Sequence, residues 1–214
     1  MKKVFNMEFS KYIVPIYVGD DYRGNGFIVN KMLIMPYHLL KIEPRSWDIH
    51  SSFCFKYDGI SYLVEAIKSI VNQGGEKDVT DNPSLARDLL VFNTEINSSN
   101  LTLSPEYILG QDCWYYGYNI EGHLLLKEII AMGKIHQQKA VVVVNGQPVE
   151  LDNGMTCICK LKPGNSGGLV CQGNNIIGMF IKDQSFLGGA YQSIFIKANY
   201  ILGTISKKIG FTFE

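Results

Sequence analysis

The sequence carries no net charge and no long apolar run. Its 214 residues include 20 Lys and Arg against 20 Asp and Glu. No overall positive field therefore exists to recruit nucleic acid or an anionic membrane. The longest apolar runs, residues 140–144 and 176–181, are far shorter than the roughly 20 residues that cross a bilayer as a helix. We expect neither nucleic-acid binding nor membrane insertion.

We also expect that the start of the chain is not an export signal. Two lysines open it, but Asn6 and Glu8 interrupt the apolar stretch that such a signal requires, and no small-residue cleavage site follows. Five cysteines without regular spacing form no disulfide framework, which fits a reducing cytoplasm. Cys157 and Cys159 lie two apart in an apolar run with no nearby partners for a metal site. We predict that they are buried structural thiols.

Short runs rich in Val, Ile, Tyr and Phe recur along the chain, bounded by Gly, Asn, Asp and Pro. This spacing is typical of β-strands joined by tight turns. Residues 93–104 lack the pattern and separate two sets of runs. Helical spacing of apolar residues occurs near the C-terminus, at Ile201, Leu202, Ile205 and Ile209. The sequence predicts an all-β fold in two halves, residues 1–100 and 101–214, with a closing helix docked on the second.

The most informative stretch is Pro163-Gly164-Asn165-Ser166-Gly167-Gly168, which places one hydroxyl among three glycines just before an apolar strand. Gly164 can adopt a backbone angle that turns its N–H inward. The N–H groups of Gly164 and Ser166 can then converge on a carbonyl oxygen that becomes an oxyanion. Gly167 and Gly168 are small enough to leave room for a substrate backbone. Since the same residue types form ordinary surface turns, this loop alone does not establish a nucleophile.

A serine nucleophile needs a base and a group that orients the base. Of the four histidines, His38 is the one that directly follows an apolar strand. Asp88 begins an apolar strand, where a carboxylate can be buried beside an imidazole, and Asp78 and Asp81 are weaker candidates on the preceding loop. A packed histidine and a strand-initiating aspartate are the competing interpretations of these residues.

Taken together and in order, the motifs resemble those of the chymotrypsin-like serine proteases. The segments that carry this resemblance are Gly24-Asn25-Gly26-Phe27-Ile28-Val29, His38, Asp88-Leu89-Leu90-Val91, Gly117-Tyr118-Asn119, Pro163-Gly164-Asn165-Ser166-Gly167-Gly168 and Ile176-Ile177-Gly178. Within that group the chain is most similar to HtrA/Deg-like protease domains, here without a PDZ domain. The resemblance covers nearly the whole chain and implies two six-stranded antiparallel β-barrels with a short C-terminal helix.

The resemblance also implies a catalytic role for each candidate. Ser166 would attack the scissile carbonyl, His38 would accept and return the proton, and Asp88 would orient the imidazole. The N–H groups of Gly164 and Ser166 would form the oxyanion hole, and no metal or cofactor is needed. The expected partners are a restricted set of protein or peptide substrates. Asn165 replaces the Asp that activates secreted digestive relatives, so we expect no switch by N-terminal cleavage.

Relatives place the residue six before the nucleophile at the base of the pocket for the side chain that precedes the cut. The pocket residues implied in this way are Lys160, Phe180, Ile181, Lys182, Gly189 and Tyr191. A lysine ammonium favours an acidic substrate side chain, whereas the mostly apolar or small walls favour a small apolar one. Both preferences stay open at this point, and the sequence leaves the oligomeric state open as well.

Two other functions fit the same fold. A picornavirus-like polyprotein-processing protease also has two barrels without an activation switch. Such enzymes carry Cys as the nucleophile, so Ser166 would stand in place of a native Cys, and they carry a His in the pocket wall, where this chain has Met179-Phe180-Ile181. A pseudoprotease would bind peptides by strand addition without cutting them. The presence of all three triad candidates argues against the pseudoprotease.

Overall fold

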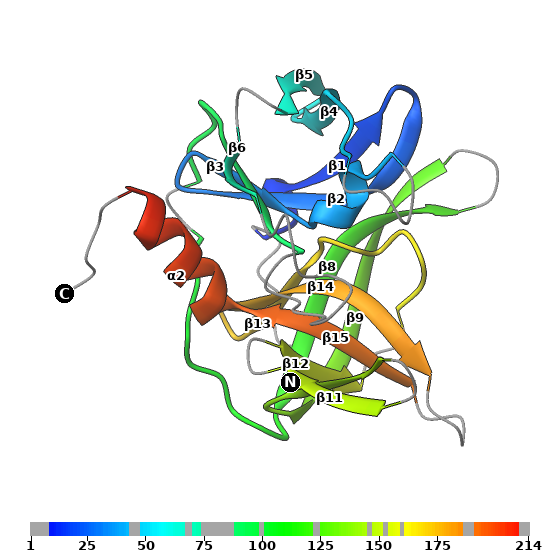
Figure 1. The fold of residues 1–214 in the computed structure, drawn as a ribbon, viewed down its shortest axis with the longest axis vertical. Coiled ribbons are helices and arrows are strands. Elements are labelled where there is room, and N and C mark those ends of the chain that lie inside the picture. Colours follow the sequence, from blue (N-terminus) through cyan, green and yellow to red (C-terminus); the bar gives the residue numbers. More distant parts are fainter. Residues whose placement is uncertain are drawn as a thin grey trace, which may run out of the picture.

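Two β-sheet units and a C-terminal helix form the architecture, with one unit above the other in Figure 1. The computed structural model describes residues 9–42, 48–66, 70–73, 88–98, 101–121, 125–144, 147–151, 154–158, 161–185 and 191–209. Strands dominate because β-branched and aromatic residues recur in short runs that turn residues interrupt.

The first unit is a curled antiparallel sheet of seven strands, in the order β5-β4-β1-β2-β3-β7-β6. Its strands are β1 (Ile13–Val18), β2 (Asp21–Val29), β3 (Met32–Met35), β4 (Ser52–Tyr57), β5 (Ile60–Glu65), β6 (Ile70–Gln73) and β7 (Leu90–Asn93). A short 3-10 helix, Tyr37–Leu40, follows β3. His38 is the second residue of this helix.

The second unit is a closed antiparallel barrel in the order β12-β15-β14-β13-β8-β9. Its strands are β8 (Asp112–Glu121), β9 (Leu125–Gln137), β12 (Gly154–Ile158), β13 (Leu169–Gln172), β14 (Asn175–Ser185) and β15 (Tyr191–Lys197). A separate hairpin joins β10 (Ala140–Val144) to β11 (Gln147–Leu151). The β8–β9 hairpin rises beside β1 and β2, so the barrel reaches the first sheet along this edge (Figure 1).

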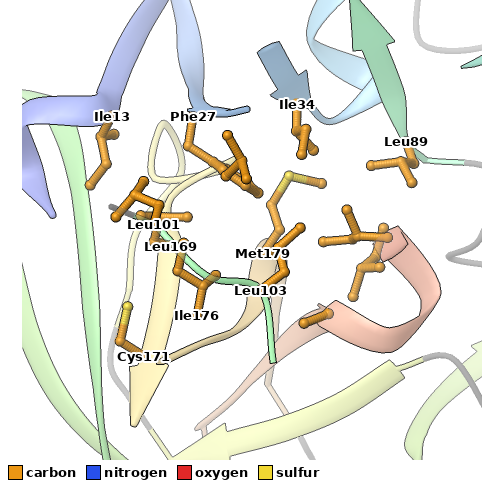
Figure 2. Close-up of a cluster of buried hydrophobic side chains, with 14 of the residues drawn as sticks. Ile13, Phe27, Ile34, Leu89, Leu101, Leu103, Leu169, Cys171, Ile176 and Met179 are labelled. Carbon is orange, nitrogen blue, oxygen red and sulfur yellow. The ribbon is translucent and has the colours of Figure 1, made fainter. Parts of the chain in front are cut away.

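A hydrophobic core joins the two units. Phe27 and Ile34 of the first sheet meet Leu169 and Met179 of the barrel in this core, and all four side chains are fully buried (Figure 2). Apolar burial of this kind stabilises the fold by roughly 25 cal/mol per Å² of surface removed from water. The core therefore holds the two units against each other. Because apolar contacts are non-directional, it does not by itself fix their exact relative position.

The predicted C-terminal helix is confirmed as α2 (Ala198–Ile209). Ile201 and Ile205 share one face of it and are buried in the core between the two units. The helix packs on β14 and β15 of the barrel and also touches β6 of the first sheet. It closes the seam between the units as well as docking on the second one.

Among the described residues, no helix has the length and apolar character needed to cross a bilayer.

The all-β class, the two sheet units and the closing helix agree with the sequence prediction. The second unit is the expected six-stranded barrel, whereas the first, in the described residues, is an open curled sheet of seven strands with β5 and β6 at its edges. A domain boundary at residue 100 stays a prediction. Cys157 is confirmed as a buried thiol, with its Sγ 3.1 Å from that of Cys113, while Cys159 lies outside the described residues.

We expect Ile201→Ala to lower the free energy of unfolding by about 2 to 5 kcal/mol, because it leaves a cavity in the core shared by both units. Chemical denaturation measures this change. Gly203→Ala is the matched control on the exposed face of α2, where an added methyl group meets no atom within 4 Å. It should instead stabilise the protein by about 0.5 to 1 kcal/mol. Equal effects of the two changes would contradict the docking of α2.

Candidate active site

Strand pairing in the first sheet brings His38 and Asp88 together. β3 and β7 run antiparallel with Met35 opposite Leu90, so the residues that follow β3 lie beside those that precede β7. The Asp88 carboxylate contacts His38 twice. Its Oδ1 accepts a hydrogen bond from the His38 backbone N–H at 2.8 Å, and its Oδ2 lies 2.7 Å from His38 Nδ1. The first contact fixes the backbone that carries the imidazole, and the second fixes the ring.

The ionic contact shifts both pKa values. Burial lowers the pKa of His38, but the negative charge of Asp88 and the hydrogen bond to it outweigh burial and raise that pKa above its ordinary value of 6.5. Burial raises the pKa of Asp88, but His38 outweighs it and lowers that pKa below 3.8. Asp88 is therefore ionised at neutral pH. In the neutral imidazole, Nδ1–H donates to the carboxylate and Nε2 keeps the lone pair of a base.

Ser166 lies in the loop between β12 and β13. Its hydroxyl donates a hydrogen bond to the backbone carbonyl of Ile181 at 2.8 Å. That carbonyl is available because Ile181 is the extra residue of a bulge in β14, where pairing with β15 steps from Phe180 to Lys182. No hydrogen bond within the described part of the chain joins Ser166 to His38. The structure thus brings His38 and Asp88 into direct contact and leaves the serine hydroxyl on another acceptor.

The loop around Ser166 follows a sharply turned path. Gly164 has a φ of 91° and Gly167 a φ of 86°, a region that strains any residue with a Cβ atom. The Asn165 N–H donates to the Lys162 carbonyl at 3.1 Å, closing a turn. For the residues that the structure describes, neither the Gly164 N–H nor the Ser166 N–H has an acceptor. These two groups, predicted as oxyanion donors, are therefore available to a ligand oxygen.

The glycines after the serine differ in role from the prediction. We expected Gly167 and Gly168 to leave room for a substrate backbone. A Cβ on Gly167 would instead collide with the backbone carbonyl of Asn25, and one on Gly168 would collide with the ring of Tyr115. These collisions show that the two glycines make room for the protein's own β2 and β8. The Gly167 N–H completes the anchoring by donating to the Phe180 carbonyl at 2.7 Å.

Asn165 is nearly fully buried, with 2% of its surface exposed. Its Oδ1 accepts hydrogen bonds from the Lys162 N–H at 2.9 Å and from Asn119 Nδ2 at 3.1 Å. Its backbone carbonyl accepts a hydrogen bond from the Tyr115 hydroxyl at 2.7 Å. The Asn165 side chain is therefore bound to the loop itself and to the neighbouring β8.

The residues predicted to line the pocket divide into three groups. Phe180 and Ile181 are buried in the hydrophobic cores, where the Phe180 ring lies 5.9 Å from that of Tyr115. Lys182 is exposed directly after the bulge, next to the carbonyl that binds Ser166. Tyr191 begins β15 opposite Ser185. The predicted residues outside the described part of the chain are Lys160, Gly189, Asp78 and Asp81.

The sequence analysis missed one residue at the site. Asn25 of β2 is fully buried, and its backbone N–H donates to the Ser166 carbonyl at 2.7 Å. A polar residue between two glycines, directly before the apolar run Phe27-Ile28-Val29, is the signal that marks this position.

We compared the chain with protein-family models, curated proteins and solved structures. No protein-family model and no curated protein matches the chain. Solved structures do match it, among them the active form of the Rv3671c protease from M. tuberculosis, with a TM-score of 0.66 and 16% identity over 96% of this chain and 83% of that one. Neuropsin, a serine protease of mouse brain, has a TM-score of 0.66 and 14% identity, covering 94% of this chain and 96% of its own.

The HtrA-type protease AlgW, bound to a decapeptide, has a TM-score of 0.65 and 15% identity, covering 93% of this chain and 65% of its own. Identities this low establish the fold and no more. The chain therefore has the chymotrypsin-like fold that its sequence motifs predicted.

We expect an NMR titration to place the pKa of His38 above 6.5 in the wild-type protein and lower in Asp88→Asn. The amide removes the negative charge that stabilises the imidazolium, so burial then dominates. Asp112→Asn is the control, because it makes the same change at an exposed carboxylate that lies 3.9 Å from Lys134. An unchanged His38 midpoint in Asp88→Asn would exclude the ion pair as the cause of the shift.

Proposed function

We propose that this chain is a serine-type endopeptidase. The observation that carries the proposal is the double contact between His38 and Asp88, within a fold shared with serine proteases. It leaves Nε2 of a raised-pKa imidazole as a base, as a serine nucleophile requires. The hydroxyl of Ser166 and two N–H groups without an acceptor in the described residues lie on one loop of the barrel.

In the proposed reaction, the Ser166 hydroxyl first leaves the Ile181 carbonyl and turns to His38 Nε2. A substrate strand that pairs with β14 at the bulge donates an N–H to that carbonyl and so displaces the hydroxyl. This exchange couples substrate binding to the release of the nucleophile. It also accounts for the absence of a Ser166–His38 hydrogen bond among the described residues.

Oγ of Ser166 then attacks the scissile carbonyl carbon while its proton passes to His38 Nε2, and Asp88 stabilises the imidazolium. The negative oxygen of the tetrahedral intermediate binds the N–H groups of Gly164 and Ser166, each worth on the order of 3 kcal/mol. Collapse of the intermediate expels the amine, which takes the proton from His38. Water then repeats the sequence on the acyl-enzyme and regenerates Ser166. This chemistry requires neither a metal nor a cofactor.

The enzyme is proposed to need no N-terminal cleavage for activity. An activating ion pair requires a carboxylate directly before the serine, and this position holds a neutral amide, Asn165. Its oxygen already accepts hydrogen bonds from Lys162 and Asn119, so the loop has its own anchors.

Acidic residues are the proposed substrate preference. Lys182 is exposed beside the bulge, and both Lys182 and Lys41 lie near enough to His38 to lower its pKa through their charge. The positive charges of these two lysines near the base attract carboxylates. This positive field favours the acidic alternative over the small apolar one and supports cleavage of a restricted set of proteins.

We expect a fluorophosphonate probe to label the intact protein at Ser166, because this reagent reacts only with an activated serine. Mass spectrometry of the labelled peptide identifies the site, and Ser166→Ala, which should not be labelled, is the control. Folded wild-type protein that stays unlabelled would overturn the serine-protease proposal. Recovery of thiol-reactive labelling and peptide cleavage in Ser166→Cys would then favour the viral-type cysteine protease, and peptide binding without turnover would favour the pseudoprotease.

For cleavage-site preference, we expect a peptide library to be cut next to Asp or Glu, and cleavage of those peptides to weaken as salt rises. Lys182→Gln should lower kcat/KM for acidic peptides about 2- to 5-fold, in line with an exposed charge pair. Lys134→Gln makes the same change on the outer face of β9 and should leave kcat/KM unaltered. Cleavage after Arg or Lys would refute the acidic preference.

A further inference from the structure

Asn25 is a buried polar residue whose hydrogen bonds cross from one sheet unit to the other. It lies in β2 of the first sheet and has no exposed surface. Its backbone N–H donates to the carbonyl of Ser166 at 2.7 Å. A fully buried carboxamide must find partners for both its oxygen and its N–H groups to avoid a large desolvation cost. The backbone groups that this side chain binds all belong to the barrel unit.

The Asn25 side chain is satisfied at both ends. Its Oδ1 accepts a hydrogen bond from the Tyr118 N–H at 2.7 Å. Its Nδ2 donates to the carbonyl oxygens of Tyr118, Gly164 and Ser166 at 3.1, 3.3 and 3.2 Å. The donor on Tyr118 and the three carbonyls fix which end of the amide is oxygen and which is nitrogen. The amide thus bridges β8 and the nucleophile loop.

Tyr22, three residues earlier on β2, supports the same acceptors. Its hydroxyl is 2.7 Å from the Tyr118 carbonyl and 2.9 Å from the Gly164 carbonyl. Burial raises the pKa of this hydroxyl, so it stays protonated and remains a donor. The two side chains of β2 therefore converge on the carbonyl of Gly164.

These contacts fix successive peptide planes around the nucleophile. A peptide unit is planar, so holding a carbonyl also sets the direction of the next N–H. Asn25 holds the carbonyls of Gly164 and Ser166, and Tyr115 holds the carbonyl of Asn165 between them. The Asn165 carbonyl shares its plane with the Ser166 N–H, one of the two proposed oxyanion donors. Three consecutive planes are therefore held from outside the loop.

We infer that Asn25 is a positioning residue: its carboxamide, supplied by the first sheet, holds the nucleophile loop of the barrel in the conformation that presents Ser166 and its N–H. The same sheet carries His38 and Asp88, so this amide also sets the position of the base relative to the nucleophile. The catalytic consequence rests on the proposed protease function, whereas the ordering of the loop does not.

The test compares Asn25→Ala with Ser98→Ala. Ser98 is a matched control because it is also fully buried and also hydrogen-bonded to β2, with its Oγ 2.6 Å from the Ile28 carbonyl and 3.2 Å from the Asn30 N–H. It makes no hydrogen bond to the nucleophile loop among the described residues. Asn25→Ala removes a buried polar group from β2, and Ser98→Ala removes one that is hydrogen-bonded to β2, so a loss of stability alone would affect them alike.

Hydrogen–deuterium exchange followed by mass spectrometry is the first measurement, since it needs no activity. We expect peptides covering residues 161–170 to exchange faster in Asn25→Ala and to keep wild-type exchange in Ser98→Ala. Asn25→Leu keeps a similar side-chain volume but removes both the donor and the acceptor. It should loosen the loop as well, which tests the hydrogen-bonding role even where Asn25→Ala does not fold.

The second measurement is inactivation by the fluorophosphonate probe. We expect the maximal inactivation rate to fall about 100-fold in Asn25→Ala, the cost of a small misplacement of reacting groups, with the concentration for half-maximal rate unchanged. Ser98→Ala should match the wild-type protein in both values. Unchanged exchange in residues 161–170, or equal effects of Asn25→Ala and Ser98→Ala, would overturn the role of Asn25. Faster loop exchange in Asn25→Ala, together with wild-type protein that the fluorophosphonate probe does not label, would refute the protease function and leave the positioning role of Asn25 intact.

Discussion

The structure depends on holding one irregular loop in place from two directions. The segment around Ser166 has no ladder of its own that could fix its peptide planes. Its carbonyls instead receive hydrogen bonds from Asn25 of the first sheet and from Tyr115 of the barrel. Because these donors belong to different units, the loop keeps its conformation only while the two units stay in register. The positive φ angles of Gly164 and Gly167 let the chain accept that conformation without strain from a Cβ.

The two units contribute complementary chemistry. Antiparallel pairing of β3 with β7 places an imidazole beside a carboxylate without any help from the barrel. The barrel supplies a hydroxyl, the bulge carbonyl of Ile181 and two N–H groups. Neither unit holds all of these groups, so the proposed chemistry requires both units. A small displacement of one unit relative to the other would therefore affect reactivity more than an equal displacement inside either sheet.

Local pattern predicted much of this arrangement. The spacing of apolar runs indicated the two sheet units, and helical spacing after residue 200 indicated α2. The positions of His38 and Asp88 at strand ends made them candidates for the base and the orienting group, but their contact became evident only from the pairing of β3 with β7. The Asn25 contacts were not predictable in this way, because they join residues 93 to 141 positions apart in the sequence. The bond between Ser166 and Ile181 depends on a bulge, which leaves no mark in a pattern of apolar residues.

A polar network inside a hydrophobic joint serves a purpose that apolar packing cannot. The core of Phe27, Ile34, Leu169 and Met179 holds the units together, but apolar contact is non-directional and tolerates small slips. A buried amide tolerates none, since each partner that it loses leaves a group unsatisfied in a medium without water. Asn25 has a partner for its oxygen and for its nitrogen in the observed register. The hydrophobic core therefore supplies cohesion, and the hydrogen bonds of the amide add a directional constraint on the position of the serine loop against the first sheet.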